Sequence, residues 1–306
     1  MNSFLKQAHV VGGMPTFQLD VLVILLNFNQ SSYLDQAINS VLMQDFKGSI
    51  RVVIHDDASS DNSQALIHEW CSRFPDTLIG ILQTENVFSK KYNIVQEVSR
   101  LIDSKYIARL DADDYWNSVD KIQIQFEAFE KDSLVSIVAH PCYFKNEIDG
   151  SYKLFELRKS GMINSRNLAF ANFIQSPTVM FRASSIEELP ENFTEYYIQD
   201  WPMWAAASKN GKIQYLPNIY STYRIHGTNG FAGKRNIDFA DTRLGITKMM
   251  RDYLLPPNRK YWSVMVILRV IFGFLDRNIS GKSLTILNTV SNKIIGLRVT
   301  KSDELN

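Results

Sequence analysis

The sequence YIARLDADD at residues 106–114 joins an apolar strand to a cluster of three carboxylates. Its first five residues form a short apolar run of the kind that predicts a strand inside a sheet. Asp111, Asp113 and Asp114 follow within four positions, and they repel each other unless a cation or hydrogen-bond donors offset their charge. Ligands bind at the carboxyl ends of strands in open α/β sheets, and Mg²⁺ and Mn²⁺ prefer oxygen ligands. The segment therefore predicts a site for a metal that carries phosphates, with a solvated acidic turn as the alternative.

Short apolar runs alternate with helical periods on both sides of this stretch. We expect strands at residues 21–26, 51–54, 77–82, 106–110 and 134–139, and helices at residues 31–43, 61–70, 93–102 and 117–129. Asp61 should cap the second helix, with Gln64 completing a capping box, and Asn117 should cap the fourth. Such alternation indicates βαβ units and hence an α/β fold with a mostly parallel sheet. Beyond residue 139 it is lost, and we expect only helices at 164–173 and 201–209 and a strand at 178–181.

The composition limits the class of protein. Of 306 residues, 45% are hydrophobic and 21% are charged, which is ordinary for a chain with a substantial core. A formal net charge of +1 gives no reason to expect a nucleic-acid partner. The 2 cysteines imply no disulfide framework, and no secretory signal is seen at the N-terminus. We therefore expect a cytoplasmic location.

The C-terminal part is basic, since Asp276 is the single acid between residues 255 and 302. It contains an apolar run at 261–275, interrupted by Arg269, that is shorter than the roughly 20 residues needed to span a bilayer. The run predicts either a helix packed on the main domain or an interfacial helix on anionic lipid at the inner face of the membrane. The glycine-rich segment 227–235 is expected to be a mobile loop that separates this basic, mostly helical extension from the rest.

Acidic residues recur at residues 56–57, 111–114 and 200. The first two groups follow strands, and turns after parallel strands share one edge of the sheet, so these carboxylates should converge on one site. For Asp56 and Asp57 alone, helix capping ahead of Asp61 is the alternative.

Taken together, the motifs resemble those of family 2 glycosyltransferases. The resemblance rests on VILLNFN at 23–29, SVLMQ at 40–44, DDASSDNS at 56–63, LDADD at 110–114, QDW at 199–201, GKI at 211–213 and YRIH at 223–226. It covers about residues 21–226 and implies the GT-A fold, a Rossmann-like, mostly parallel sheet flanked by helices. It also implies a nucleotide-sugar donor, usually a UDP-sugar, a divalent Mg²⁺ or Mn²⁺ ion, and inversion at the anomeric carbon.

The resemblance further implies a role for individual residues. Asp113 would bind the metal, which stabilises the leaving diphosphate as a Lewis acid, and His226 would be a further ligand of the metal or of the diphosphate. Asp200 would be the general base that takes the proton of the acceptor hydroxyl, although a helix cap is the alternative. The donor would be bound by Phe28 and Asp57 at the base, Asp111 near the ribose or a metal-bound water, and Asp114 at the sugar or in the turn. Lys234 and Arg235 could clamp phosphate.

The same reasoning divides the chain into a catalytic domain at residues 18–230 and an extension at 231–306. Within the domain, residues 18–140 would bind the nucleotide and residues 141–230 the acceptor, a glycan or a lipid-linked molecule in cell-surface polysaccharide synthesis. The sequence departs from the family pattern at Leu26, where proline is common, and at Gln199, where glutamate is common. The second departure removes a carboxylate beside Asp200.

Two other functions compete with this interpretation. Phosphatases with an aspartate nucleophile also use a D-x-D motif, but they place it after the first strand, where this chain has Asn27-Phe28-Asn29. A non-catalytic domain of the same fold, which binds sugar or nucleotide or acts as a scaffold, would be expected to lose the metal or base carboxylate. Both Asp113 and Asp200 are present.

Overall fold

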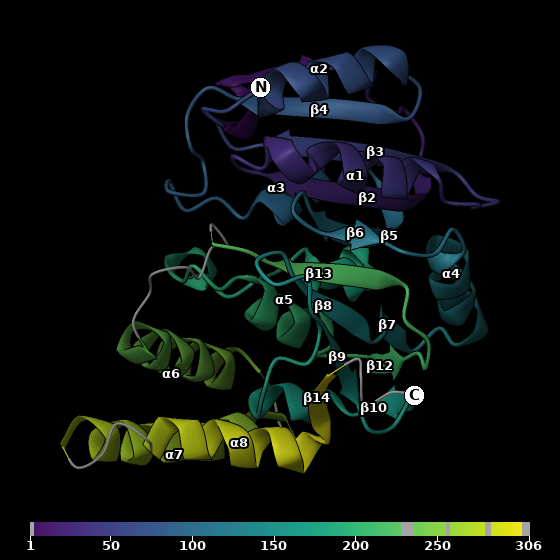
Figure 1. The fold of residues 1–306 in the computed structure, drawn as a ribbon. Coiled ribbons are helices and arrows are strands. Elements are labelled where there is room, and N and C mark those ends of the chain that lie inside the picture. The colour runs from purple at the N-terminus through teal and green to yellow at the C-terminus, as the bar shows by residue number, and fades with distance from the viewer. Residues whose placement is uncertain (1–2, 228–235, 255–257, 279–282, 302–306) are drawn as a thin grey trace.

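The computed structural model describes residues 3–227, 236–254, 258–278 and 283–301, which form two β-sheets surrounded by helices (Figure 1). The strands are β1 (Ala8–Val11), β2 (Leu19–Asn27), β3 (Ile50–Asp56), β4 (Leu78–Gln83), β5 (Ser104–Asp111), β6 (Tyr115–Trp116), β7 (Val135–Ala139), β8 (Cys142–Asn146), β9 (Tyr152–Leu157), β10 (Gly161–Ile163), β11 (Met180–Arg182), β12 (Lys212–Tyr215), β13 (Ser221–Ile225) and β14 (Leu297–Lys301). The α-helices are α1 (Ser31–Leu42), α2 (Ser63–Arg73), α3 (Ile94–Leu101), α4 (Lys121–Lys131), α5 (Asp200–Ala207), α6 (Asn236–Tyr253), α7 (Asn258–Asn278) and α8 (Ser283–Ile295). Short 3₁₀ turns are η1 (Ser3–Leu5), η2 (Ser165–Ala169), η3 (Ser176–Thr178), η4 (Ala183–Ile186) and η5 (Phe193–Glu195).

The larger sheet, as far as the structure describes it, has nine strands in the order β1-β4-β3-β2-β5-β11-β7-β12-β10. Strands β4, β3, β2 and β5 are parallel neighbours, which confirms the predicted parallel core. Their register sets Asn27 beside Asp56 and Leu26 beside Asp111. The two acidic groups that follow β3 and β5 therefore meet at one edge of the sheet, as predicted.

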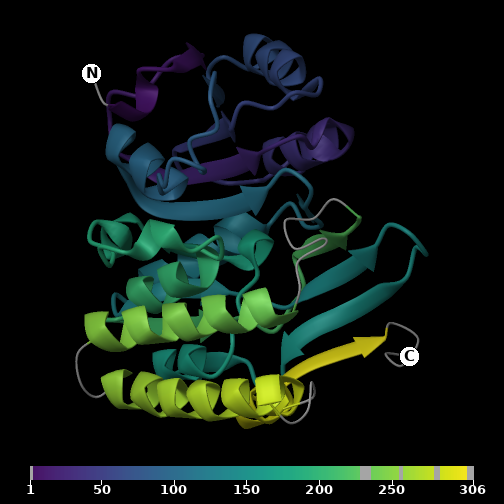
Figure 2. The same ribbon diagram turned by 90° about the vertical axis from the view of Figure 1, so that its left-hand side faces the viewer.

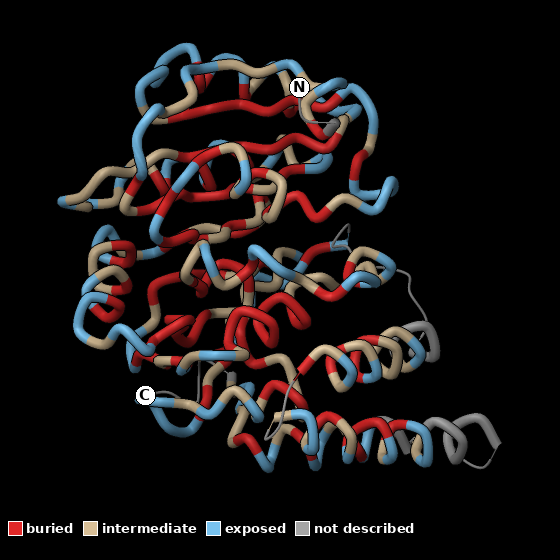
Figure 3. The backbone as a smooth tube through the Cα atoms, turned by 180° about the vertical axis from the view of Figure 1, so that it is seen from behind, coloured by how far each residue is buried: buried red, intermediate tan, exposed pale blue. Residues whose placement is uncertain are grey.

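Both faces of this sheet are covered, so its strands consist of continuous apolar runs rather than alternating ones. In β2, Val21, Val23 and Leu25 pack towards α1 and α2, while Leu22 and Ile24 pack into the core shared with α3 and α5. The tube coloured by burial shows these strands as long buried stretches (Figure 3). The apolar runs that predicted the strands therefore contribute side chains to the core on both faces of the sheet.

Two helix starts differ from the sequence prediction. Helix α2 begins after Asn62, and Gln64 donates to Asp56 and to the carbonyl of Gln83 instead of closing a capping box. Helix α4 begins at Lys121, later than expected, because Asn117 accepts a hydrogen bond from Thr222 on β13. Polar side chains assigned to local caps are used for tertiary contacts.

The region after residue 139 contains more strands than expected. A second sheet of described strands runs β14-β9-β8-β13-β6, and β11 inserts antiparallel between β5 and β7. The helix expected at 164–173 is wrong except for the 3₁₀ turn η2 (Ser165–Ala169). These short strands are only partly buried and lack the alternation that reveals a strand in sequence.

One face of the C-terminal extension packs on the body, as one of the two alternatives for the apolar run at 261–275 predicted. Trp262 and Met265 on α7 are buried, and the Trp262 ring lies 5.8 Å from that of Trp201 on α5. Strand β14 returns to pair antiparallel with β9 (Figure 2). Among the described residues, no helix combines the length and apolar character needed to cross a bilayer. Residues 228–235 of the loop predicted at 227–235, and with them the boundary at 230/231, lie outside the described residues.

Candidate active site

A cleft of about 800 Å³ lies at the carboxyl end of the parallel strands. It reaches from the ends of β2 and β3 to the start of α5 and on to the C-terminal helices. Functional side chains that line it are those of Phe28, Asp57, Arg109, Asp111, Asp113, Asn172, Gln175, Asp200, Tyr223, Arg243 and Arg269. The cleft thus joins all three acidic groups of the sequence in one cavity.

Asp56 and Asp57 have different environments. Asp56 is fully buried and accepts hydrogen bonds from Asn27 at 2.7 Å, from the Ser59 hydroxyl at 2.6 Å and from Gln64 at 2.7 Å. It fixes the turn after β3, which leaves Asp57 facing the cleft.

The Asp57 carboxylate accepts the backbone N–H of Val87 at 2.7 Å and that of Phe88 at 3.3 Å. Burial raises the pKa of Asp57, and these two donors oppose that shift. Each carboxylate oxygen can accept more than one hydrogen bond, so one donor from a ligand can be added. The ring of Phe28 lines the same end of the cleft and is 49% exposed, which leaves an aromatic face available for a flat base.

Asp113 and His226 form the pair predicted to bind a metal. The His226 Nε2 atom lies 3.0 Å from Asp113 Oδ2, and the exposed fractions of the two side chains are 6% and 17%. Within the described ranges, no group of three or more His, Cys, Asp or Glu side chains is arranged to hold a metal ion. One oxygen and one nitrogen ligand fit a Mg²⁺ or Mn²⁺ ion whose other positions are taken by diphosphate oxygens and water, as is usual for Mg²⁺.

Arg109 was missed by the sequence prediction. It lies on β5, where its guanidinium donates to Asp111 at 3.1 Å. The charges of Asp111 and Asp200 raise its pKa against the effect of burial, so it links the D-x-D segment to Asp200. The available signal was a cation inside an apolar strand, two residues before Asp111 and therefore on the same face.

The structure buries Asp114 away from the cleft. The side chain is 1% exposed, does not line the cleft, and accepts the backbone N–H of Arg224 at 2.8 Å. Burial and the charges of Asp113 and Asp111 raise its pKa well above the ordinary value. Of the two roles predicted for Asp114, the structure favours the turn, because this residue ties the end of β5 to β13.

Asp200 is the first residue of α5 and also faces the cleft. Its Oδ1 accepts the backbone N–H of Trp201 at 2.7 Å, and its Oδ2 accepts the side-chain amide of Asn172 at 3.1 Å. Desolvation raises the pKa of Asp200, while Arg109, the Trp201 N–H and Asn172 oppose the shift. The N-cap position predicted as the alternative for Asp200 is taken by Gln199, so Asp200 is the first helical residue and its carboxylate lines the cleft.

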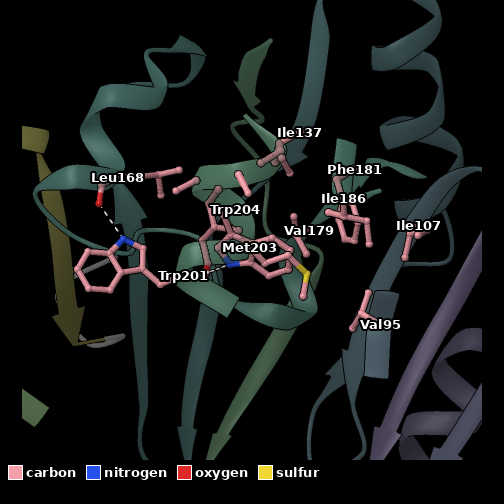
Figure 4. Close-up of a cluster of buried hydrophobic side chains, with 14 of the residues drawn as sticks. Val95, Ile107, Ile137, Leu168, Val179, Phe181, Ile186, Trp201, Met203 and Trp204 are labelled. Atoms are coloured by element: carbon pink, nitrogen blue, oxygen red, sulfur yellow. Dashed lines mark hydrogen bonds between the residues drawn. The ribbon is translucent and has the colours of Figure 1, made fainter. Parts of the chain in front are cut away.

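Helix α5 is a rigid support for this carboxylate. The Trp201 Nε1–H donates to the carbonyl of Leu168 at 2.7 Å, and that of Trp204 donates to Ile174 at 3.2 Å (Figure 4). The Trp204 ring is completely buried and lies 5.5 Å from that of Phe181 on β11. Two satisfied indoles thus anchor the turn that begins with Asp200.

Most of the predicted site residues are therefore brought together. Five line the cleft: Phe28, Asp57, Asp111, Asp113 and Asp200. His226 joins them through Asp113, whereas Asp114 does not reach the cleft. The predicted phosphate clamp of Lys234 and Arg235 lies outside the described residues. Besides Arg109, the sequence prediction missed Asn172, Arg243 and Arg269, which lie in segments with no recognisable motif.

Solved structures with this fold include glycosyltransferases. TarS 1-349 of S. aureus in complex with UDP-GlcNAc is 16% identical, with a TM-score of 0.61 over 87% of this chain and 75% of that one. The mannosyltransferase PcManGT of Pyrobaculum calidifontis, in complex with GDP-Man and Mn²⁺, is 14% identical, with a TM-score of 0.55 over 95% of this chain and 84% of that one. These likenesses show the GT-A fold.

Sequence comparison gives the family. An uncharacterized glycosyltransferase of Nostoc sp. is 30% identical over 69% of this chain and 66% of its own length. An uncharacterized protein of Mycobacterium tuberculosis is 25% identical over 67% of this chain, which spans 58% of that relative's length. The profile of "Glycosyl transferase family 2" matches residues 22–189. The chain belongs to the family 2 glycosyltransferases.

Proposed function

We propose that this chain transfers a sugar, with inversion, from a nucleotide-sugar to a hydroxyl of a glycan or lipid-linked acceptor in cell-surface polysaccharide synthesis. The observation that carries the proposal is the shared cleft, in which Asp57 and Phe28 lie at one end, Asp113 lies beside His226, and Asp200 stands on α5. A nucleotide, a diphosphate and an acceptor need these three environments in one cavity. The catalytic domain would comprise residues 18–230, with the nucleotide part at 18–140.

The chain's own residues would divide the work as follows. Phe28 stacks on the base, Asp57 accepts a hydrogen bond from it, and Asp111 lies near the ribose. Asp113 and His226 hold a Mg²⁺ or Mn²⁺ ion, which when bound stabilises the negative charge of the leaving diphosphate. Asp200 takes the proton of the acceptor hydroxyl as that oxygen attacks the anomeric carbon.

A UDP-sugar is the donor we propose. Support comes from TarS, solved with UDP-GlcNAc, and from a relative named "Minor teichoic acid biosynthesis protein GgaA" in Bacillus subtilis. The latter is 32% identical over 136 residues, which cover 43% of this chain and 30% of the relative. The divalent ion is supported by the Mn²⁺ complex of PcManGT.

The experiment that tests this function is a screen of UDP-, GDP- and other nucleotide-sugars for hydrolysis, with Mn²⁺, with Mg²⁺ and with EDTA. We expect one UDP-sugar to release UDP in the presence of the metal and to raise the melting temperature of the protein. Metal-independent binding of UDP with no turnover of any sugar nucleotide would instead support the non-catalytic alternative.

The environment of Asp200 predicts a particular pH dependence. A base must be deprotonated, so activity falls as the pH drops through its pKa, and the raised pKa of Asp200 moves this loss to a higher pH than for an ordinary aspartate. Asn172→Ala removes a hydrogen bond that lowers this pKa, so the acid limb of the kcat/KM profile should move further up. Asn210→Ala, at an exposed site just after α5, should leave the profile unchanged. If the acid limb of Asn172→Ala lies at the same pH as that of the wild type, the limb does not report the ionisation of Asp200.

A membrane surface is the partner that we propose for the outer face of α7 and α8. Exposed apolar side chains follow helical spacing on both helices: Val264, Ile267 and Ile271 on α7, and Ile286, Val290 and Ile294 on α8. The neighbouring exposed charges are basic: Arg259, Lys260, Lys293 and Arg298. An apolar face bordered by cations is complementary to anionic lipid. The enzyme would therefore be peripheral on the inner face of the membrane, close to a lipid-linked acceptor.

This contact can be tested with vesicles. Wild-type protein should sediment with phosphatidylglycerol-containing vesicles but not with pure phosphatidylcholine, and the double variant Ile267→Glu/Ile294→Glu should lose most of this binding. The control is Ile148→Glu, which alters an 81% exposed residue between β8 and β9. Equal sedimentation of the double variant and wild type would show that this face does not touch lipid.

A further inference from the structure

Two arginines from the C-terminal helices line the cleft near Asp200. Arg243 lies on α6 and Arg269 on α7, and Arg269 is only 5% exposed. The Arg269 guanidinium carbon lies 5.2 Å from the centre of the Trp201 ring, and Trp201 directly follows Asp200. The extension therefore contributes positive charge to the interior of the catalytic cleft.

Neither arginine is neutralised by a carboxylate of the described chain. Arg243 donates to the side-chain oxygen of Asn288 at 2.8 Å, and Arg269 makes a long contact of 3.5 Å to the carbonyl of Phe170. The Nε of Arg269 is buried and has no hydrogen-bond acceptor among the described residues. The guanidinium of Arg269 carries five N–H donors, and its one hydrogen bond within the described residues is the long contact to Phe170.

Their electrostatic environment is unfavourable without a ligand. Burial and the like charge of Arg243 lower the pKa of Arg269 to about 9, and burial also lowers the pKa of Arg243. An uncompensated buried charge is strongly destabilising, whereas a planar guanidinium binds phosphate through paired hydrogen bonds. The pair is suited to an anion that arrives with the substrate.

We propose that Arg243 and Arg269 form an anion subsite that binds a phosphate group of the acceptor, near the hydroxyl that receives the sugar. This inference rests on the proposed function, because Asp200 is the residue that faces the acceptor hydroxyl. The diphosphate of the donor belongs beside Asp113 and His226, whereas the arginines adjoin Trp201 on the Asp200 side. Asn288 and Asn292 on α8 also line the cleft and supply neutral polar groups for a polyol or sugar-phosphate backbone.

The phosphate could belong to a soluble polyol phosphate or to a lipid-linked one, and binding can distinguish them. Thermal shift and calorimetry of the full chain would use sn-glycerol 3-phosphate, dihexanoyl phosphatidic acid and, as the neutral control, glycerol. Both phosphates should stabilise the wild type, and glycerol should not. If phosphatidic acid stabilises the protein markedly more than glycerol 3-phosphate does, the subsite binds a lipid-linked acceptor. If the two stabilise it equally, the subsite recognises the phosphate group alone.

The matched variants are Arg269→Met, Arg243→Gln and, as the control, Arg73→Gln at an exposed position on α2 that does not line the cleft. Loss of charge-assisted hydrogen bonds should weaken glycerol 3-phosphate binding on the order of tenfold or more in the first two variants and not in the third. Arg269→Met should keep or raise the melting temperature of the ligand-free protein, because it removes an unpaired buried charge. If Arg269 had only a structural role, Arg269→Met would lower the melting temperature and leave phosphate binding unchanged. That result would overturn the proposal.

UDP binding in the same variants separates this inference from the proposed function. Unchanged UDP binding together with lost glycerol 3-phosphate binding assigns the arginines to the acceptor. Weaker UDP binding with intact glycerol 3-phosphate binding would place the donor diphosphate there and contradict the inference. Wild-type protein that binds glycerol 3-phosphate through the arginines but binds no nucleotide would refute the donor assignment alone.

Discussion

Replacing Asp200 with asparagine is expected to reduce sugar transfer about 10²- to 10⁴-fold, the range over which a positioned general base contributes. The amide keeps the size of the side chain and can still accept the Trp201 N–H, so α5 should retain its start. Nucleotide binding should change little, because the base and metal contacts lie on other elements. Initial rates with a saturating donor, together with calorimetric UDP titrations, measure the two effects separately.

Asp76→Asn is the matched control, since it makes the same chemical change at an exposed loop position before β4. Its rate should equal that of the wild type. Turnover of Asp200→Asn within a few-fold of this control would remove Asp200 as the base and restrict it to the helix-end contact seen with Trp201.

Replacing Asp113 with alanine is expected to abolish the effect of Mn²⁺ on UDP binding. The variant removes the oxygen member of the Asp113–His226 pair, whose atoms lie 3.0 Å apart. Changes in the partners of metal ligands already cost about 10- to 100-fold in affinity, so loss of a ligand should weaken metal-supported UDP binding on the order of a hundredfold. The affinity measured in EDTA should be nearly the same as for the wild type.

Asp120→Ala is a suitable comparison, because this exposed carboxylate precedes α4 without making a side-chain cap. It should retain the full response to Mn²⁺. An Asp113→Ala protein that responds to Mn²⁺ as well as this control does would show that the ion is held elsewhere or is not used.

The parallel half of the fold was predictable because its signals are local. Each strand of the core is an apolar run buried on both faces, and the carboxyl ends of β3 and β5 carry acidic groups, as at Asp57 and Asp111. Register then follows from parallel pairing, which sets Leu26 beside Asp111. The convergence of the acidic groups was therefore available from sequence.

The second sheet was not predictable, because its pairing is remote and its strands are short. Strand β14 pairs with β9 at the edge of that sheet, although the two strands are far apart in the sequence. No local sequence pattern predicts this pairing. Caps failed for a related reason: Gln64 and Asn117 have the right chemistry for helix starts but bond to distant partners. Tertiary contacts override local preference at such positions.

Within the site, the acidic residues and His226 were predicted, whereas the arginines were missed. Asp113 and Asp200 stand in motifs, whereas Arg109 lies inside a strand and Arg269 inside an apolar helix run. A cation within an apolar run is the one signal the sequence offered, and in both cases it marked a cleft residue. What such an arginine faces depends on packing, which the sequence does not show.

The central claim is that Asp200 and the Asp113–His226 pair serve one reaction in one cleft. The most direct measurement is UDP release from a UDP-sugar by wild type, Asp200→Asn and Asp113→Ala, each with Mn²⁺ and with EDTA. We predict that the wild type releases UDP only with Mn²⁺. Asp200→Asn should release no significant UDP although it binds UDP with Mn²⁺ normally. Asp113→Ala should lose both UDP release and the Mn²⁺-dependent binding of UDP. Wild-type-like release by Asp200→Asn, or release by the wild type that is equal in EDTA, would contradict it.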